Sequence, residues 1–414
     1  MKIAIIGAGI SGLSAGKLLK EKGFDVTIFE HNIVVGGIAR TKYVNDAAYH
    51  VTGGHCFNSK YSEVLDFVFK KVMPIENWHK VQRKSHINFK SHFVSYPIEY
   101  AMKEIADFDL ELATNMVKDY FDTGTEDRSN LANWFRTKFG RTLAEEYFIP
   151  YNEKIWNQKA EDMLPDWVED KLPLPDKSGF AKALLKSNTD TMSHSSFYYP
   201  NSNNQNSFID SLAENLNIKF DYPVNSVKRD SGKWLINDER HFDIVINTSP
   251  LNIFPRIIND CPSVILEAAS LLKYNKVTTM IWKTHGTQDT WTYYPQKDSL
   301  FHRHIHLGNF FVPQQNLSIT EAVGEHSYET MVNEGEGFDY LIEPLDYHVS
   351  DHAYVVFDHN YKNSRKVVMD YIQSQDGLYT LGRFGEWEYY NMDICIKSAM
   401  RLVDEIFVNH KSKT

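Results

Sequence analysis

The sequence is poor in cysteine, in basic charge and in long apolar runs. It holds three cysteines in 414 residues, Cys56, Cys261 and Cys395, and their spacing fits no metal site. This count indicates a reducing compartment and argues against a disulfide framework, so we expect structural thiols and no bound metal. Acidic residues outnumber basic ones by 54 to 44, without a long basic stretch. That balance argues against nucleic acid or an anionic membrane surface as a partner.

No apolar run approaches the roughly 18 residues that span a bilayer, so no integral membrane segment is expected. The opening stretch MKIAIIGAGI is too short in its apolar part and too rich in glycine for a signal peptide. It predicts the first strand of a sheet instead. These features together predict a soluble, cytoplasmic protein.

The length and the apolar content predict more than one structural unit. A chain of 414 residues with 42% hydrophobic residues exceeds a typical domain and can bury a large core. The aromatic fraction of 14% is high. Most of these rings are expected in the core, but tyrosine and tryptophan also suit the lining of a ligand cleft.

The N-terminal stretch predicts a site for the phosphates of a dinucleotide. Ile3 to Ile6 form a short β-branched run, typical of a strand buried in a parallel sheet. A G-x-G-x-x-G turn follows and opens a helix from about Ser11 to Lys22, whose amino end faces the phosphates. One glycine allows the sharp bend, one the approach of the pyrophosphate and one the packing of helix on strand. They are Gly7, Gly9 and Gly12.

The residues after this helix predict which dinucleotide binds. A second strand, Asp25 to Phe29, ends at Glu30, which can take the ribose hydroxyls of an adenosine and disfavours a 2′-phosphate. Gly36, Gly37 and Arg40 then add a second glycine pair and a forked cation suited to a phosphate. With this extension the stretch resembles the FAD-binding signature of the superfamily of amine oxidases, protoporphyrinogen oxidases, GDP-dissociation inhibitors and UDP-galactopyranose mutases. The resemblance implies FAD as the cofactor.

The expected fold class is α/β, with a Rossmann-like FAD-binding domain, an inserted helical unit and an antiparallel-sheet substrate domain. The stretch HFDIVINTSPL holds a buried strand, Ile244 to Ile246, that is expected to return to the first sheet. Residues 97–199 are expected to form the helical insertion, and residues 76–96 and 263–349 the substrate domain. The FAD-binding domain is expected to be discontinuous, over residues 1–75, 200–262 and 350–414.

Four stretches, spread over nearly the whole chain, narrow the resemblance to the UDP-galactopyranose mutase family. GGHCFNS resembles the glycine-histidine loop of that family beside the flavin, and YFIPYNEKIW resembles its tyrosine-tryptophan segment. WTYYPQKDSLFHR resembles its tyrosine and arginine strand. GRFGEWEYYNMD resembles its closing flavin and substrate motif and is the most specific of the four.

The resemblance implies roles for individual residues. Those implied to contact a UDP-sugar are Tyr151, Trp156, Lys171, Tyr293, Arg303, Tyr389 and Asn391. Those implied to contact FAD, besides the N-terminal glycines, Glu30 and Arg40, are Ser11, Gly54, His55, Gly382, Arg383 and Asp393. The candidate catalytic residues are Arg303 and Tyr389, which would hold the leaving diphosphate, and His55, which would tune the flavin. A fixed guanidinium fork also makes chemical sense, because an acidic protein needs local cations to bind a diphosphate.

The chain departs from the family pattern at two places. Lys171 stands where the family usually has a second diphosphate arginine, and lysine supplies charge without the bidentate fork. Asn203 and Asn204 stand where the family generally has a glycine pair near the flavin, and they add bulk there. Both departures leave the natural sugar open.

The leading hypothesis is a flavin-dependent mutase that interconverts UDP-galactopyranose and UDP-galactofuranose, or a related UDP-sugar. The resemblance implies a covalent adduct between the sugar and reduced FAD, and a place in cell-surface polysaccharide biosynthesis. One alternative is an FAD-dependent oxidoreductase of the amine oxidase or protoporphyrinogen oxidase type, which requires an apolar substrate tunnel. The other is a non-catalytic binder resembling GDP-dissociation inhibitors. The sequence leaves the oligomeric state open, a homo-oligomer included.

Overall fold

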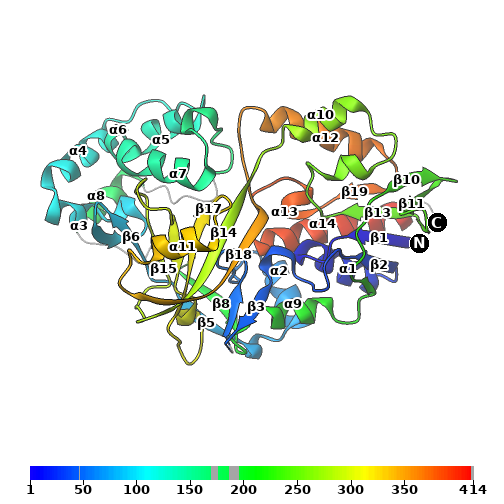
Figure 1. Cartoon of the computed structure of the whole chain (residues 1–414). Helices are drawn as coiled ribbons and strands as arrows, with labels where there is room; N and C mark the ends of the chain where they lie inside the picture. The colour runs from blue at the N-terminus through cyan, green and yellow to red at the C-terminus, as the bar shows by residue number, and fades with distance from the viewer. Residues whose placement is uncertain (46, 169–175, 186–194, 412–414) are drawn as a thin grey trace.

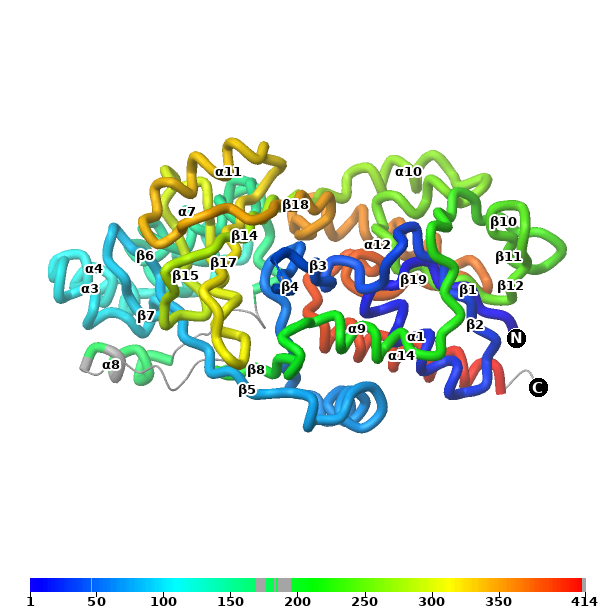
Figure 2. The backbone as a smooth tube through the Cα atoms, turned by 60° about the horizontal axis from the view of Figure 1, so that its bottom comes forward, coloured from blue at the N-terminus to red at the C-terminus, as the bar shows by residue number. Residues whose placement is uncertain are grey.

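The computed structural model describes residues 1–45, 47–168, 176–185 and 195–411. Figure 1 shows a helical unit at one end of the molecule, both chain termini at the other end, and long strands in between. The turned view of Figure 2 keeps this arrangement, so the helical unit and the termini lie far apart. In the described part of the chain, we find no helix long and apolar enough to cross a membrane.

A five-stranded parallel sheet forms the end of the molecule that carries the termini. Its strands, in spatial order, are β19 (Leu378–Thr380), β13 (Ile244–Asn247), β1 (Lys2–Ile6), β2 (Asp25–Phe29) and β9 (Ile218–Lys219). All four pairings are parallel. The predicted return of residues 244–246 to the first sheet is therefore confirmed, since Ile244 pairs with Ile3.

Helices cover both faces of this sheet, because its β-branched strands have apolar residues on both sides. On one face, Ile3 and Ile5 pack against α1 (Ile10–Glu21), α9 (Asn206–Ala213) and α14 (Met392–Lys411). On the other face, Ala4 and Ile6 pack against α10 (Ser263–Ser270) and α12 (Tyr361–Ser374). The result is the three-layer Rossmann-like arrangement expected from the sequence.

A seven-stranded sheet occupies the middle of the molecule. Its strands, in spatial order, are β18 (Leu341–Val355), β14 (Tyr274–Thr284), β17 (Leu317–Val323), β16 (Arg303–Ile305), β15 (Trp291–Tyr293), β6 (Ser85–Phe89) and β7 (His92–Ser95). The sheet is antiparallel, as expected for the substrate domain, except that β15 pairs with β6 in parallel. The ladder between β14 and β18 has three irregularities, where the register shifts.

The helical unit packs beside this sheet. Its helices are α3 (Met102–Phe108), α4 (Leu110–Phe121), α5 (Leu131–Phe139), α6 (Arg141–Leu143), α7 (Ile149–Trp156) and α8 (Lys177–Leu185). Aromatic rings fill its core: Phe148 stacks on Phe139 with ring centroids 4.0 Å apart and on Phe135 at 5.1 Å. Side-chain caps fix two helix starts, since Asp109 accepts from the amide of Leu112 and Asn130 from that of Asn133.

Smaller elements connect these units. Two antiparallel pairs are the hairpin of β3 (Thr41–Val44) with β4 (Ala47–His50), and the long-range pair of β5 (Trp78–Gln82) with β8 (Ser196–Pro200). A three-stranded sheet of β10 (Val227–Asp230), β11 (Lys233–Ile236) and β12 (Arg240–Phe242) lies near the termini. The remaining helices are α2 (Ser62–Asp66), α11 (Tyr328–Gly335) and α13 (Gly382–Gly385). The parallel sheet uses only residues within the predicted FAD-binding segments, while the exact domain boundaries stay a prediction.

Three buried histidines alternate along the chain at β16: His302 directly precedes the strand, His304 lies in it and His306 directly follows it. Burial lowers the pKa of His302 to about 3 and that of His306 to about 4, and the pKa of His304 also lies below its ordinary value. His306 is held by the hydroxyls of Thr292 and Ser318, each 2.9 Å away. These side chains are therefore neutral in the folded protein at and below neutral pH.

We expect this histidine row to make the fold sensitive to acid. The histidines have a pKa of about 6.5 in the unfolded protein, so below this pH the unfolded state binds protons that the folded state does not bind. The free energy of unfolding therefore falls as the pH drops from about 6.5 towards 4. The expected loss is roughly 1 kcal/mol per histidine between pH 7 and 5.5. Urea unfolding at both pH values checks this. His306→Gln should reduce the pH dependence, whereas His92→Gln, a change at an exposed side chain, is the control. An unchanged pH dependence in His306→Gln would contradict the interpretation.

Candidate functional site

A cavity of about 650 Å³ lies where the carboxyl ends of β1 and β13 face the seven-stranded sheet. Crevices at this edge of a doubly wound sheet are the usual place of ligand sites. The predicted site residues that line the cavity are Gly7, Gly9, Ser11, Glu30, Gly36, Gly37, Arg40, Gly54, His55, Tyr293, Arg303, Arg383, Tyr389, Asn391 and Asp393. Residues from both ends of the sequence thus meet in one cavity.

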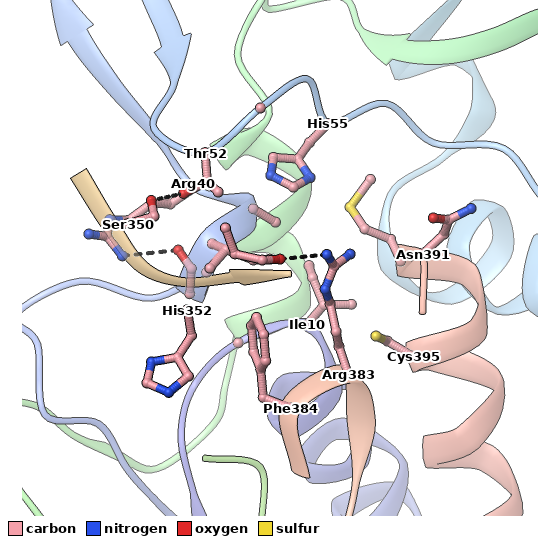
Figure 3. Close-up of a pocket in the computed structure, with 18 of the residues that line it drawn as sticks. Ile10, Arg40, Thr52, His55, Ser350, His352, Arg383, Phe384, Asn391 and Cys395 are labelled. Atoms are coloured by element: carbon pink, nitrogen blue, oxygen red, sulfur yellow. Dashed lines mark hydrogen bonds between the residues drawn. The ribbon is translucent and has the colours of Figure 1, made fainter. Parts of the chain in front are cut away.

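The cavity has two sides with different chemistry. We call the part around Gly7, Gly9, Gly36, Gly37 and Glu30 the glycine side. The part lined by phenols and guanidinium groups is called the arginine side, and its residues are Arg83, Tyr293, Arg303, Tyr354 and Tyr389. His55 and Arg383 line the cavity as well, and Figure 3 shows Arg383 reaching up from α13 towards the loop that carries His55.

On the glycine side, the backbone segments around the N-terminus of α1 approach one another too closely for most side chains. Gly7 has a φ of +100° and Gly36 a φ of +107°, and residues other than glycine rarely adopt such angles. A Cβ on Gly12 would lie 2.0 Å from the carbonyl oxygen of Gly7, so this glycine allows the helix to pack on the turn. Likewise, a Cβ on Gly382 would lie 2.0 Å from Oγ of Ser11. Gly12 and Gly382 therefore shape the site without lining it.

Gly9 differs from these glycines. Its φ of −77° is accessible to any residue, and a Cβ there would meet only the Cα of Gly37, at 4.0 Å. Neither the backbone angle nor a contact with the described residues requires a glycine at this position. A ligand in the cavity that approaches the backbone closely would require it. Allowing this approach is the role expected of the second glycine of the motif.

Glu30 lies buried beside this turn, 4% exposed. Its carboxylate accepts hydrogen bonds from the amides of Ala8, at 2.7 Å, and Asn32, at 2.9 Å. Burial acts to raise the pKa of this carboxyl, but His31 and the two amides outweigh it, and the pKa lies below its ordinary value. A buried, ionised carboxylate on the cavity wall is suited to accept hydrogen bonds from ribose hydroxyls.

Between the two sides, His55 and Arg383 present buried nitrogens without a partner. In the described part of the chain, no hydrogen-bond partner is found for Nε2 of His55 or for Nε of Arg383. Burial, followed by the charge of Arg383, lowers the pKa of His55 to about 4, so its ring is neutral at pH 7. Arg383 is fixed through its terminal nitrogens, which donate to the carbonyls of Ala353, at 2.6 Å, and Tyr390, at 3.2 Å.

On the arginine side, Arg303 is bound to a buried carboxylate. Arg303 on β16 lies directly opposite Glu321 on β17, and its Nε donates to the Glu321 carboxylate, which is 1% exposed. Its Nη2 donates to the hydroxyl of Tyr354, at 2.9 Å. Burial acts to raise the pKa of Glu321, but Arg303 holds it below its ordinary value. The pair is ionised and carries no net charge.

The two predicted ligands from α7 lie one layer behind the cavity lining. The ring of Tyr151 is edge-on to Tyr293, with centroids 6.0 Å apart, and the ring of Trp156 is edge-on to Tyr389 at 5.7 Å. Both side chains are buried in the core that the helical unit shares with the sheet. In the described structure they support the two tyrosines that line the cavity, and their direct contact with a substrate stays a prediction.

Two further expectations concern Lys171 and the pair of Asn203 and Asn204. Lys171 lies outside the described residues. Asn203 adopts a left-handed conformation with a φ of +56°, as expected for a glycine substitute, but its side chain bonds the backbone of Val312. Asn204 bonds Thr41 and Tyr43. The two amide side chains are therefore directed at the backbone of Val312 and at strand β3.

The sequence interpretation missed several lining residues. Among them are Arg83, between β5 and β6, and Glu321 and Tyr354, which hold Arg303. For Glu321 a signal was present, since a glutamate interrupts the apolar strand SITEAV. Nothing near Arg83 in the sequence distinguishes it from a surface residue. It enters the site only because β6 pairs with β15.

These features fit a flavin dinucleotide. The open face of Gly9 and the buried carboxylate of Glu30 suit the pyrophosphate and ribose, and Arg40 lines the cavity beside them. The nitrogens of His55 and Arg383 that lack a partner among the described residues are polar groups that could hydrogen-bond a flavin ring. The residues present can therefore hold the cofactor that the N-terminal motif predicts.

We expect Gly9→Ala to lose the cofactor and keep the fold. A methyl group fits the protein at this position, so the variant should lose about 1 kcal/mol of stability or less. It would occupy the path of the pyrophosphate and should weaken FAD binding by roughly tenfold or more. Flavin content after purification and thermal unfolding of the flavin-free protein check both effects. Gly12→Ala is the matched contrast, because its methyl collides with backbone and should unfold the domain. Full flavin occupancy in Gly9→Ala would refute the site.

We expect Arg303→Met to destabilise the fold by about 3–5 kcal/mol, because it leaves the buried Glu321 carboxylate without its cation. The double variant with Glu321→Gln should recover most of the loss, since the amide keeps a partner for Tyr354 and carries no charge. Urea unfolding of the wild type and of both variants measures the coupling. A single variant as stable as the wild type would show that the pair contributes nothing.

Comparisons with known proteins agree with this architecture. Residues 5–71 match the model of the NAD(P)-binding Rossmann-like domain. Among curated proteins, a 15-cis-phytoene desaturase of Synechococcus elongatus is 36% identical over 86 residues, 21% of this chain and 17% of that protein. An L-glutamate oxidase precursor of Streptomyces diastatochromogenes is 61% identical over 41 residues, 10% of this chain and 6% of that protein. The matched stretch thus spans less than a fifth of either relative.

Solved structures resemble the chain over nearly its whole length. A reduced UDP-galactopyranose mutase superposes with a TM-score of 0.86 at 20% identity, covering 98% of this chain and 95% of that one. A putative protoporphyrinogen oxidase from Exiguobacterium superposes with a TM-score of 0.74 at 15% identity, covering 99% of both chains. The chain therefore has a Rossmann-like dinucleotide-binding domain within the overall fold that these two enzymes share.

Proposed function

We propose that the protein is a flavoenzyme that holds FAD on the glycine side of the cavity and a nucleoside-diphosphate sugar on the arginine side. The observation that carries this proposal is the makeup of the arginine side. Two guanidinium groups and three phenols, each joined to the next by a hydrogen bond, strand pairing or ring contact, form one stretch of the cavity wall. Such a wall suits a diphosphate. An oxidase acting on an apolar substrate would instead need an apolar tunnel at this place.

The reaction proposed is the interconversion of the pyranose and furanose forms of UDP-galactose or of a related UDP-sugar. When bound and reduced, FAD supplies a nucleophilic ring nitrogen for the anomeric carbon of the sugar. Arg303, Tyr293 and Tyr389 hold the diphosphate as it leaves and keep it in place for its return. No net oxidation of the sugar is required, and the likeness to the mutase fold is consistent with this assignment.

The protein contributes chiefly by positioning. His55 is neutral at pH 7 and therefore offers a hydrogen-bonding nitrogen without a charge. Arg303 is kept in one orientation by Glu321 and Tyr354, so its remaining nitrogen is fixed before the ligand arrives. Tyr151 and Trp156 support Tyr293 and Tyr389 from behind. Asn391 and Asp393, at the start of α14, line the cavity next to Tyr389.

Anaerobic turnover tests the proposed reaction. Purified protein should show flavin absorbance and, once reduced with dithionite, should convert UDP-galactofuranose into UDP-galactopyranose, as separated by chromatography. The oxidised protein is the matched control and should be inactive. Oxygen consumption with an amine or another donor, without sugar conversion, would support an oxidase of the amine oxidase type. A protein without flavin that cannot take up FAD would support a non-catalytic binder.

A further inference from the structure

Besides Arg40 on the glycine side, three arginines line the cavity, and they differ in what neutralises their charge. Arg303 is paired with the Glu321 carboxylate and contributes no net charge. Arg383 donates both terminal nitrogens to backbone carbonyls. For Arg83, no carboxylate lies within 4.0 Å among the residues that the structure describes. Arg83 is therefore the cation of the arginine side that still lacks a counter-charge.

Contacts on several sides hold the Arg83 side chain in place. Its Nε donates to Oγ of Ser85, at 3.1 Å, and its Nη2 to the hydroxyl of Tyr293, at 2.6 Å. The guanidinium carbon lies 4.9 Å from the ring centroid of Trp291 and 5.1 Å from that of Tyr96. Both distances are within the range of a cation–π interaction. The group is thus oriented before any ligand binds.

These contacts compensate the charge only in part. The two aromatic faces and the hydroxyls attract a cation weakly, whereas a guanidinium group that is half-buried without an anion is costly. No hydrogen bond of its Nη1 is found in the described part of the chain, and Arg83 lines the same cavity as Arg303 and Tyr293. An anion bound in the cavity would complete both the charge and the hydrogen bonding.

We propose that Arg83 binds the diphosphate of the ligand and supplies the net positive charge of that subsite. Arg303 then contributes hydrogen bonds from a neutral pair, and the hydroxyl of Tyr293 is fixed by Arg83 so that it faces the same phosphates. This inference rests on the proposed nucleotide-sugar function. It gives Arg83 the role of the second diphosphate cation, which was expected of Lys171, and Arg83 supplies the guanidinium fork that lysine lacks.

The test compares the binding of UDP and of uridine by isothermal titration calorimetry, with the flavin-loaded protein. Arg83→Met should weaken UDP binding by about 10- to 100-fold, the range of a lost hydrogen bond to a charged group. Uridine binding and flavin content should not change, because neither involves the diphosphate subsite. Arg83→Lys should fall between the wild type and Arg83→Met, since it keeps the charge and loses the fork. Lys84→Met removes one charge from the exposed neighbouring residue and is the matched control.

Each outcome decides a different question. A wild-type protein that binds no UDP overturns the nucleotide-sugar function and this inference together. UDP binding that is equally tight in the wild type and in Arg83→Met overturns the inference alone, as does an equal loss of UDP and uridine binding, which would indicate a packing role. Should Arg83→Met fail to hold flavin, Arg83→Gln keeps a donor for Tyr293, and the same comparison of UDP with uridine applies to it.

Discussion

The structure depends on the close approach of the backbone around the N-terminus of α1. Three contacts meet there: Gly12 against the carbonyl of Gly7, the bridge between Gly9 and Gly36, and Gly382 against Ser11. Each requires the absence of a Cβ or a left-handed backbone, or leaves the space that a ligand needs. Because Gly382 belongs to the last part of the chain, these contacts also bring α13 and α14 to the cavity. The glycine side of the cavity and the residues that follow Gly382 are therefore held together by the same backbone contacts.

The electrostatics of the other half of the cavity follow a different rule. A protein of net charge −10 needs local cations at the place where an anion binds. Two arginines are placed there with different results, one on strand β16 of the seven-stranded sheet and one just before its strand β6. Arg303 is matched by a carboxylate on the adjacent strand and gains rigidity, while Arg83 is held by aromatic rings and a phenol and keeps its charge. Arg303 thus supplies an oriented hydrogen-bond donor, and Arg83 supplies the net positive charge.

Much of the glycine side was predictable from the sequence, because its spacing is local. Gly7, Gly9 and Gly12 lie within six residues, in the turn and the first turn of α1, and Glu30 directly follows the next strand. Their order in the sequence therefore already implies their arrangement in space. The arginine side was predicted only in part. Arg83 and Glu321 acquire their roles through the pairing of β6 with β15 and of β16 with β17, which no short motif encodes.

The sequence also could not predict which side chains line the cavity and which lie behind the lining. Tyr151 and Trp156 belong to the expected segment, but whether a ring lines a cavity or supports a neighbour depends on side-chain packing over a few ångströms, and here both lie one layer behind. The boundary between the parallel sheet and the seven-stranded sheet is equally a matter of packing. It passes through β14 and β18, which begin or end beside the first sheet and continue into the second.

The pairing of β14 with β18 has a mechanical consequence. A long ladder of backbone hydrogen bonds resists hinge motion, so these two strands do not act as a flexible linker. Bending is easiest where the ladder is interrupted, at the register shifts near Asn275, Ile281 and Lys283. The shift at Asn275 lies opposite Tyr354, the partner of Arg303, so the most compliant point of the connection adjoins the wall that faces the ligand.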